Sequence, residues 1–242
     1  MITSVAEIAA RGLTALLAPQ TCAVCGGAAE AGIPVCDRCL EERYYREAAN
    51  PRLLRCSVCG RPLLSAINRC VGCRTEKGAS SPLDGIHVLY PYDSANQLLL
   101  TAWKIAGLRG LSPYFARCFA LALARLDAGE RAVIPVPPRP GKIRERGWDQ
   151  MEEIAAILRK RHRVNVMRPL TRKSAIQQKK LGHEERLMNL KGAIRCERFE
   201  SYPPNVYVID DLTATGSTLE ACAEALKSAG AGKVYGLALF YD

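Results

Sequence analysis

The chain has 242 residues, an apolar content of 48% and a formal net charge of +10. This length can bury one hydrophobic core with a small satellite, and no apolar run is long enough to span a membrane. The positive charge is concentrated in residues 139–195, which hold 16 Lys and Arg against 6 Asp and Glu and leave 18 of each sign elsewhere. This distribution suits a polyanionic ligand such as a diphosphate or a nucleic acid, although a solvated basic surface would have the same composition.

The N-terminal residues 5–17 predict a short amphipathic helix that is interrupted by Glu7 and Arg11. The segment has neither a basic leader nor an A-x-A cleavage site, so it does not resemble a signal peptide. We therefore expect a cytoplasmic location, with the apolar face of this helix packed on the protein rather than on a membrane.

Cysteine spacing dominates the next segment. Eight of the eleven cysteines form four C-x-x-C pairs, and the second group of four repeats the first at a period of 34 residues. Each pair lets two thiolates reach one tetrahedral ion, whereas disulfides are not expected in a cytoplasmic chain. The segment has few large apolar residues, so bound metal would replace a core. The pattern predicts two structural zinc sites in a domain of residues 1–79, with ligands Cys22, Cys25, Cys36, Cys39, Cys56, Cys59, Cys70 and Cys73. Sequential grouping is preferred, and an interleaved grouping of 22/25 with 56/59 stays open.

From about residue 80 the pattern becomes α/β. Strands are expected at residues 85–92, 132–136 and 164–167, and helices at 97–105, 113–126 and 148–163, with Asp149 as a helix N-cap. Alternating strands and helices predict a parallel sheet with right-handed crossovers, which assigns residues 80–242 to one α/β domain.

Two polar segments of this domain are candidates for ligand binding. The stretch of residues 134–150, with a basic loop at 140–147, brings Arg139, Lys142, Arg144 and Arg146 together after a strand end, and such a loop can clamp a diphosphate or simply be solvated. Residues 174–189 are polar and basic without a steady periodicity until residue 184, which fits either a mobile lid or an exposed connection.

The most informative stretch is residues 206–230. A short apolar strand at 206–209 precedes Asp210 and Asp211, a turn of small hydroxylic residues follows, and a helix is expected from Leu219 to Ser228 with Gly230 beyond its end. The helix N-terminus and the small turn form an anion site, while paired carboxylates can accept hydrogen bonds from the two neighbouring hydroxyls of a ribose. The stretch therefore predicts a ligand with a phosphate next to a diol.

This stretch resembles the phosphoribosyl-diphosphate (PRPP) loop of type I phosphoribosyltransferases, although Ala214 stands where Thr or Asp is usual. The C-x-x-C pairs, I-P-V-P, R-E-R-G-W-D-Q and Q-x-x-L-x-x-x-x-R-x-x-N together make almost the whole chain similar to the ComF (competence protein F) family. The resemblance implies a type I phosphoribosyltransferase fold behind a double zinc ribbon. One departure is Asp149, where that family usually has Asn.

The resemblance also implies site residues. Asp210 and Asp211 would hold the ribose hydroxyls, and Arg144 and Arg146 would stabilise the departing diphosphate. Further PRPP contacts are implied for Thr213, Ala214, Thr215, Gly216, Ser217, Thr218, Lys104, Gly147, Gln150, Gln178, Arg186 and Asn189. Leu181 matches a position of the flexible loop that the family has over its active site.

The expected function is transfer of a phosphoribosyl group from PRPP, with Mg²⁺, to an unknown acceptor, in association with DNA uptake during natural transformation. An alternative is a non-catalytic adaptor that binds single-stranded DNA or a competence helicase and uses PRPP as a regulatory ligand. A third is an adenine-type purine-salvage phosphoribosyltransferase, favoured only by the run Ala214-Thr215-Gly216.

Overall fold

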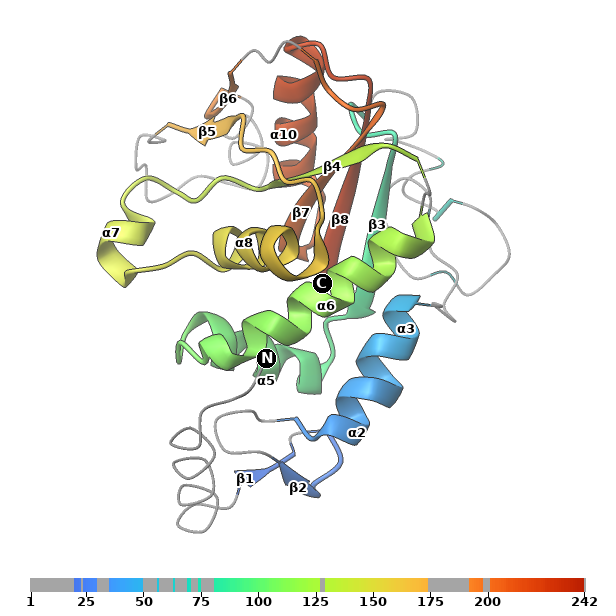
Figure 1. Cartoon of the computed structure of the whole chain (residues 1–242), viewed down its shortest axis with the longest axis vertical. Helices are drawn as coiled ribbons and strands as arrows, with labels where there is room; N and C mark the ends of the chain where they lie inside the picture. The colour runs from blue at the N-terminus through green and yellow to red at the C-terminus, as the bar shows by residue number, and fades with distance from the viewer. Residues whose placement is uncertain are drawn as a thin grey trace.

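A parallel β-sheet forms the centre of the computed structural model, which describes residues 20–22, 24–29, 35–49, 56, 63, 69–70, 74, 81–126, 129–173, 192–197 and 201–241. The four strands of this sheet are all parallel to their neighbours. From edge to edge the order is β3 (Gly85–Pro91), β8 (Lys233–Tyr241), β7 (Asn205–Thr213) and β4 (Arg131–Pro135) (Figure 1). The expected α/β class with a parallel sheet is confirmed.

Both faces of this sheet are covered, which explains its apolar strands. On β7, Val206 and Val208 enter one hydrophobic core, and Tyr207 and Ile209 enter the core on the opposite face. Successive residues of a strand point to opposite faces, so a strand buried on both sides must be apolar at every position.

Helices form the two outer layers. One face carries α5 (Ser94–Lys104), α6 (Ser112–Leu126), which follows the 3₁₀ turn η2 (Arg109–Leu111), and α8 (Gln150–His162). The other face carries α10 (Ser217–Ser228), so the domain has three layers (Figure 1). Trp103, Phe119 and Leu158 fill the first interface, and Leu219 and Leu226 fill the second, all with full burial.

The connections of β4 and β7 leave in opposite directions. After β4 the chain runs through α7 (Lys142–Arg146) and α8 to Val166, which pairs in parallel with Val133 of β4. Because β4 already pairs with β7 on its other side, the chain after β4 continues to the outer edge of the sheet. The chain after β7 instead runs through α10 to β8, on the opposite side of β7 from β4. In open α/β sheets, ligands bind beyond the carboxyl ends of the strands at such a switch point.

A small antiparallel hairpin stands beside α10. It consists of β5 (Leu170–Arg172) and β6 (Ile194–Cys196), with Leu170 paired to Cys196 and Arg172 paired to Ile194. Leu170 and Ile194 are buried in the same core as α10, so this hairpin is packed on the body of the domain.

The N-terminal segment also joins the core. A short ladder of β1 (Gln20–Thr21) and β2 (Ala28–Ala29) precedes a helix formed by α2 (Asp37–Cys39), the π-helical η1 (Leu40–Tyr45) and α3 (Arg46–Ala49). Tyr44 is buried, donates to Asn96 Oδ1 at 2.6 Å and accepts at its carbonyl from Tyr90 Oη at 2.6 Å. This helix therefore packs against the α5–α6 face of the sheet. The predicted boundary at residue 79 stays a prediction.

Several elements differ from the expected ones. Strand β7 continues four residues beyond 209 because Asp210, Leu212 and Thr213 pair with β8, a strand that was not predicted. Helix α7 lies inside the expected loop between Gly141 and Gly147, which have φ of 81° and 75°, and its five residues are too few to show a period. Strands β5 and β6 were also not predicted. The expected helix at 5–17 and the polar segment 174–189 lie outside the described residues.

Some expectations are met in detail. Asp149 is the N-cap of α8, because its Oδ1 accepts from the amides of Met151 at 2.9 Å and Glu152 at 3.1 Å. Gly230 follows α10 with a φ of 98°, as expected for a residue that ends a helix. Within the described residues, no helix is both long and apolar enough to cross a membrane.

Candidate functional site

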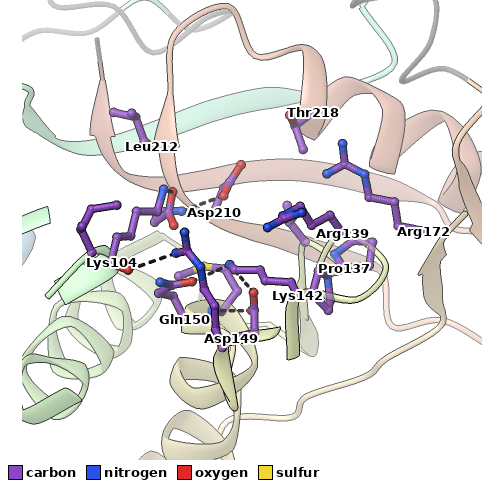
Figure 2. A pocket seen from close by; sticks show the side chains of 16 residues that line it. Lys104, Pro137, Arg139, Lys142, Asp149, Gln150, Arg172, Asp210, Leu212 and Thr218 are labelled. Atoms are coloured by element: carbon purple, nitrogen blue, oxygen red, sulfur yellow. Dashed lines mark hydrogen bonds and ion pairs between the residues drawn. The ribbon is translucent and has the colours of Figure 1, made fainter. Parts of the chain in front are cut away.

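A cavity of about 430 Å³ lies at the carboxyl ends of β4 and β7, at the switch point of the sheet. Its walls come from the end of α5, the segment after β4, the start of α8, strand β5, the end of β7 and the start of α10 (Figure 2). The lining residues are Lys104, Ile105, Val136, Pro137, Pro138, Arg139, Lys142, Arg146, Asp149, Gln150, Met151, Arg172, Asp210, Asp211, Leu212 and Thr218.

Two adjacent acids at the end of β7 form the middle of this cavity. Because residues alternate along a strand, Asp211 lies toward α5, where its Oδ1 accepts from Lys104 Nζ at 2.6 Å. Asp210 is half-buried, and its Oδ1 accepts from the amide of Asp211 at 2.8 Å. Burial and then the charge of Asp211 raise the pKa of Asp210 to about 7, so Asp210 exchanges a proton near neutral pH.

The segment between β4 and α8 supplies basic groups. Lys142 Nζ donates to Asp149 Oδ2 and to Gln150 Oε1, both at 2.5 Å, and Asp149 is 5% exposed. These contacts hold the start of α7 against the N-terminus of α8. Asp149, the departure from the ComF pattern, therefore has two structural roles, as the N-cap of α8 and as the partner of Lys142.

The turn after β7 brings the N-terminus of α10 to the cavity. Gly216 has a φ of 79°, which favours glycine, and a Cβ at this position would lie 3.0 Å from Ile86 Cδ1, so a larger residue would also have to displace the Ile86 side chain. Thr215 Oγ1 and Ser217 Oγ are 2.9 Å apart and share a hydrogen bond. Gly216 has no side chain to cap the helix, and the first-turn amides of α10 are suited to an anion.

The predicted site residues fall into three groups. The structure brings six of them together as lining of the cavity: Lys104, Arg146, Gln150, Asp210, Asp211 and Thr218. A second group lies beside the cavity. Thr213 is the buried last residue of β7, Gly147 ends α7, and Arg144 lines a neighbouring pocket. The group also contains the remaining residues of the turn after β7, namely Ala214, Thr215, Gly216 and Ser217. The third group lies outside the described residues and consists of Gln178, Leu181, Arg186 and Asn189.

Arg172 is a lining residue that the sequence analysis did not single out. Arg172 is the last residue of β5 and lies 38 positions before Asp210 in the chain. Strand β5 was not predicted. Its only signal in the sequence is membership of the basic stretch 139–195, which does not separate Arg172 from its neighbours.

The first four cysteines of the N-terminal segment form a compact group. The thiols of Cys22, Cys25, Cys36 and Cys39 lie within 4.8 Å of one another, as the sequential grouping predicts. A tetrahedral ion with metal–sulfur distances of about 2.3 Å needs sulfurs about 3.8 Å apart. The Sγ atoms of Cys25 and Cys36 are 3.7 Å apart, so this group could bind a metal such as zinc.

Local hydrogen bonds also favour metal binding at this group. Burial acts to raise the pKa of Cys22, but hydrogen bonds from the backbone at Cys36, Cys25 and Val24 outweigh it and lower the pKa to about 6. The thiolate is the form that binds metal, and it is favoured at Cys22, whereas burial and the neighbouring thiols raise the pKa of Cys39. Of the second predicted group, Cys56 is buried and Cys70 is half-buried, whereas Cys59 and Cys73 lie outside the described residues, so the second site stays a prediction.

Comparison with known proteins does not assign this chain to a family. No model of a known protein family matches it, and no curated protein matches it. The function must therefore be argued from the geometry and charges of the cavity.

Proposed function

We propose that this protein binds PRPP in the cavity at the carboxyl ends of β4 and β7, on a type I phosphoribosyltransferase fold, and transfers its phosphoribosyl group to an acceptor. The observation that carries the proposal is the order of groups in the cavity. In Figure 2, Asp210 lies between Lys142, from the segment after β4, and Thr218, at the start of α10. A ribose with a diphosphate at C1 and a phosphate at C5 has the complementary order.

The acids suit the ribose. Asp210 and Asp211 can accept hydrogen bonds from the two hydroxyls, and the Lys104 ammonium at 2.6 Å offsets the charge of Asp211. Their donor set is oxygen only, which fits Mg²⁺, and Asp210 and Asp211 would hold that ion near the ribose. Mg²⁺ would supply positive charge that stabilises the departing diphosphate.

The basic residues suit the leaving group. In the proposed reaction the bond from C1 to the diphosphate oxygen breaks, its electron pair leaves with the diphosphate, and C1 bonds to the nucleophile of the acceptor, whose proton passes to solvent. Arg139, Lys142 and Arg146 would stabilise the negative charge that develops on the diphosphate, and the contacts of Lys142 with Asp149 and Gln150 orient that ammonium beforehand.

Calorimetry with PRPP and Mg²⁺ tests the proposal. The parent protein should bind, and the variant Asp210→Asn/Asp211→Asn should bind at least 10-fold more weakly, since each lost hydrogen bond to a charged group costs about 1.5–3 kcal/mol. Glu130→Gln/Glu224→Gln removes the same two charges from exposed positions and should bind as the parent does. Equal affinity of the acid-pair variant and the parent would refute the proposal, and release of diphosphate on addition of candidate acceptors would report turnover.

A second candidate function is binding of single-stranded DNA with PRPP as a regulatory ligand. The observation that favours it is a cluster of exposed cations at the end of α8, namely Arg159, Lys160, Arg161 and Arg163. Phosphate contacts from this cluster predict that affinity for a fluorescent single-stranded oligonucleotide falls steeply with salt, and that replacing two of these residues by Ala reduces the slope by about 1.4. Absence of salt-dependent binding would exclude this candidate.

A further inference from the structure

The basic side chains of the cavity differ in their partners. Lys104 forms an ion pair with Asp211, Lys142 with Asp149, and Arg139 with Glu145 at 2.7 Å. The two remaining cations are Arg146, which donates to the carbonyl of Lys104 at 3.2 Å, and Arg172. Within the described part of the chain, neither of these two guanidinium groups forms an ion pair. Each can therefore bind an anionic group of a ligand without breaking an ion pair among the described residues.

Arg172 is held in place by the hairpin. Side chains alternate along β5, so Arg172 shares a face with Leu170, which is buried in the core beneath α10. The backbone of Arg172 pairs with Ile194 of β6. The side chain is half-buried, and Figure 2 shows its guanidinium directed toward the cavity on the side of Thr218. A guanidinium presented from a packed strand loses little entropy when it binds an anion.

The two unpaired guanidinium groups belong to different ends of the cavity. Arg146 contacts Lys104 at the end of α5, on the side of Asp211. Arg172 lies on the side of Thr218, the second residue of α10 (Figure 2). Figure 2 shows Asp210 between Lys104 and Arg172, so on each side of this acid the cavity has a guanidinium group that forms no ion pair with the described residues.

We propose that Arg172 determines specificity for a ligand with a phosphate monoester at the α10 end of the cavity. This inference rests on the proposed function and assigns the 5′-phosphate of the phosphoribosyl group to Arg172 together with the amides of α10. A guanidinium donates two parallel hydrogen bonds to a phosphate, whereas the diphosphate lies with Arg146 at the other end. The cavity would accordingly discriminate ribose 5-phosphate from ribose.

The test measures binding of two fragments of PRPP, ribose 5-phosphate and inorganic diphosphate, each with Mg²⁺. Arg172→Gln should weaken binding of ribose 5-phosphate by about 10- to 100-fold and leave diphosphate binding within about twofold, from the energy of a charged hydrogen bond. Arg146→Gln is the matched control, since it removes the other unpaired guanidinium and should show the opposite pattern. Arg172→Lys, which keeps the charge without the paired donors, should give an intermediate affinity for ribose 5-phosphate.

The outcomes separate this inference from the proposed function. If the parent and Arg172→Gln bind PRPP and ribose 5-phosphate equally well, the role of Arg172 is refuted and the proposed function stands. If the parent protein binds neither compound, the proposed function fails and this inference fails with it. Thermal unfolding of each variant checks folding, and Arg172→Lys keeps the inference testable if the Gln variant is unstable.

Discussion

Replacement of Lys104 by Met should make the protein less stable at pH 8, because Asp211 would lose its counter-charge. Met keeps the length and the apolar stem of the lysine, so the packing of α5 changes little. Lys104 Nζ and Asp211 Oδ1 are 2.6 Å apart, and at an effective dielectric constant of about 20 two unit charges at this distance attract by about 6 kcal/mol.

The measured loss should be smaller than this attraction. The Lys104 side chain is 29% exposed and the Asp211 side chain 10% exposed, so water screens the ion pair. In Lys104→Met, water can also hydrate part of the Asp211 carboxylate. Removing one partner of a fully buried pair costs about 3–5 kcal/mol, and for this partly exposed pair we expect about 1–3 kcal/mol at pH 8.

Urea unfolding followed by tryptophan fluorescence provides the assay, since Trp103 is fully buried next to Lys104. The double variant Lys104→Met/Asp211→Asn should recover much of the stability lost in Lys104→Met and thereby measure the coupling. Lys160→Met, at an exposed position in the last turn of α8, serves as the matched control and should change stability by less than 0.5 kcal/mol. A Lys104→Met variant as stable as Lys160→Met at pH 8 would refute the reasoning.

Three further predictions concern other parts of the molecule. Because the pKa of Asp210 is about 7, about one tenth of this carboxyl is ionised at pH 6 and nine tenths at pH 8. Affinity for PRPP with Mg²⁺ should therefore rise about 10-fold from pH 6 to pH 8, and it should rise less in Asp210→Asn. Cys36→Ser, or removal of metal by a chelator, should lower the melting temperature and the helical circular dichroism signal, since α2 begins directly after this thiol. Gly216→Val should cost about 2–3 kcal/mol in urea unfolding, because a φ of 79° is strained for valine and Ile86 lies 3.0 Å from the added Cβ.

Each of these three predictions has a result that contradicts it. If affinity rises as steeply with pH in Asp210→Asn as in the parent, the rise comes from ionisation of the ligand's phosphates and not of Asp210. Metal analysis that finds no ion in the purified parent protein would contradict the metal-binding interpretation of the four thiols. A Gly216→Val variant with unchanged stability would mean that the turn after β7 adopts another conformation in solution.

The comparison of α8 and β7 shows how far local patterns reach. The N-cap role of Asp149 was predictable because it depends only on the amides two and three residues later. The strand after residue 205 was predictable from its apolar run. Its extension to Thr213 was not, because the acids and the threonine are held in the strand by pairing with β8, a partner that the local sequence does not reveal.

Features that depend on near neighbours could be predicted from the amino-acid sequence alone. These are the α/β alternation, the acids that precede a small turn and a helix, and the thiol spacing that brings Cys22, Cys25, Cys36 and Cys39 together. Which distant side chains meet, in contrast, follows from the packing of the whole fold. Lys104 reaches Asp211 across 107 residues, and Arg172 enters the same cavity from a hairpin, because strand order and crossover direction bring these segments to one edge of the sheet. Such contacts depend on how the layers pack, and packing is a property of the whole chain rather than of any segment.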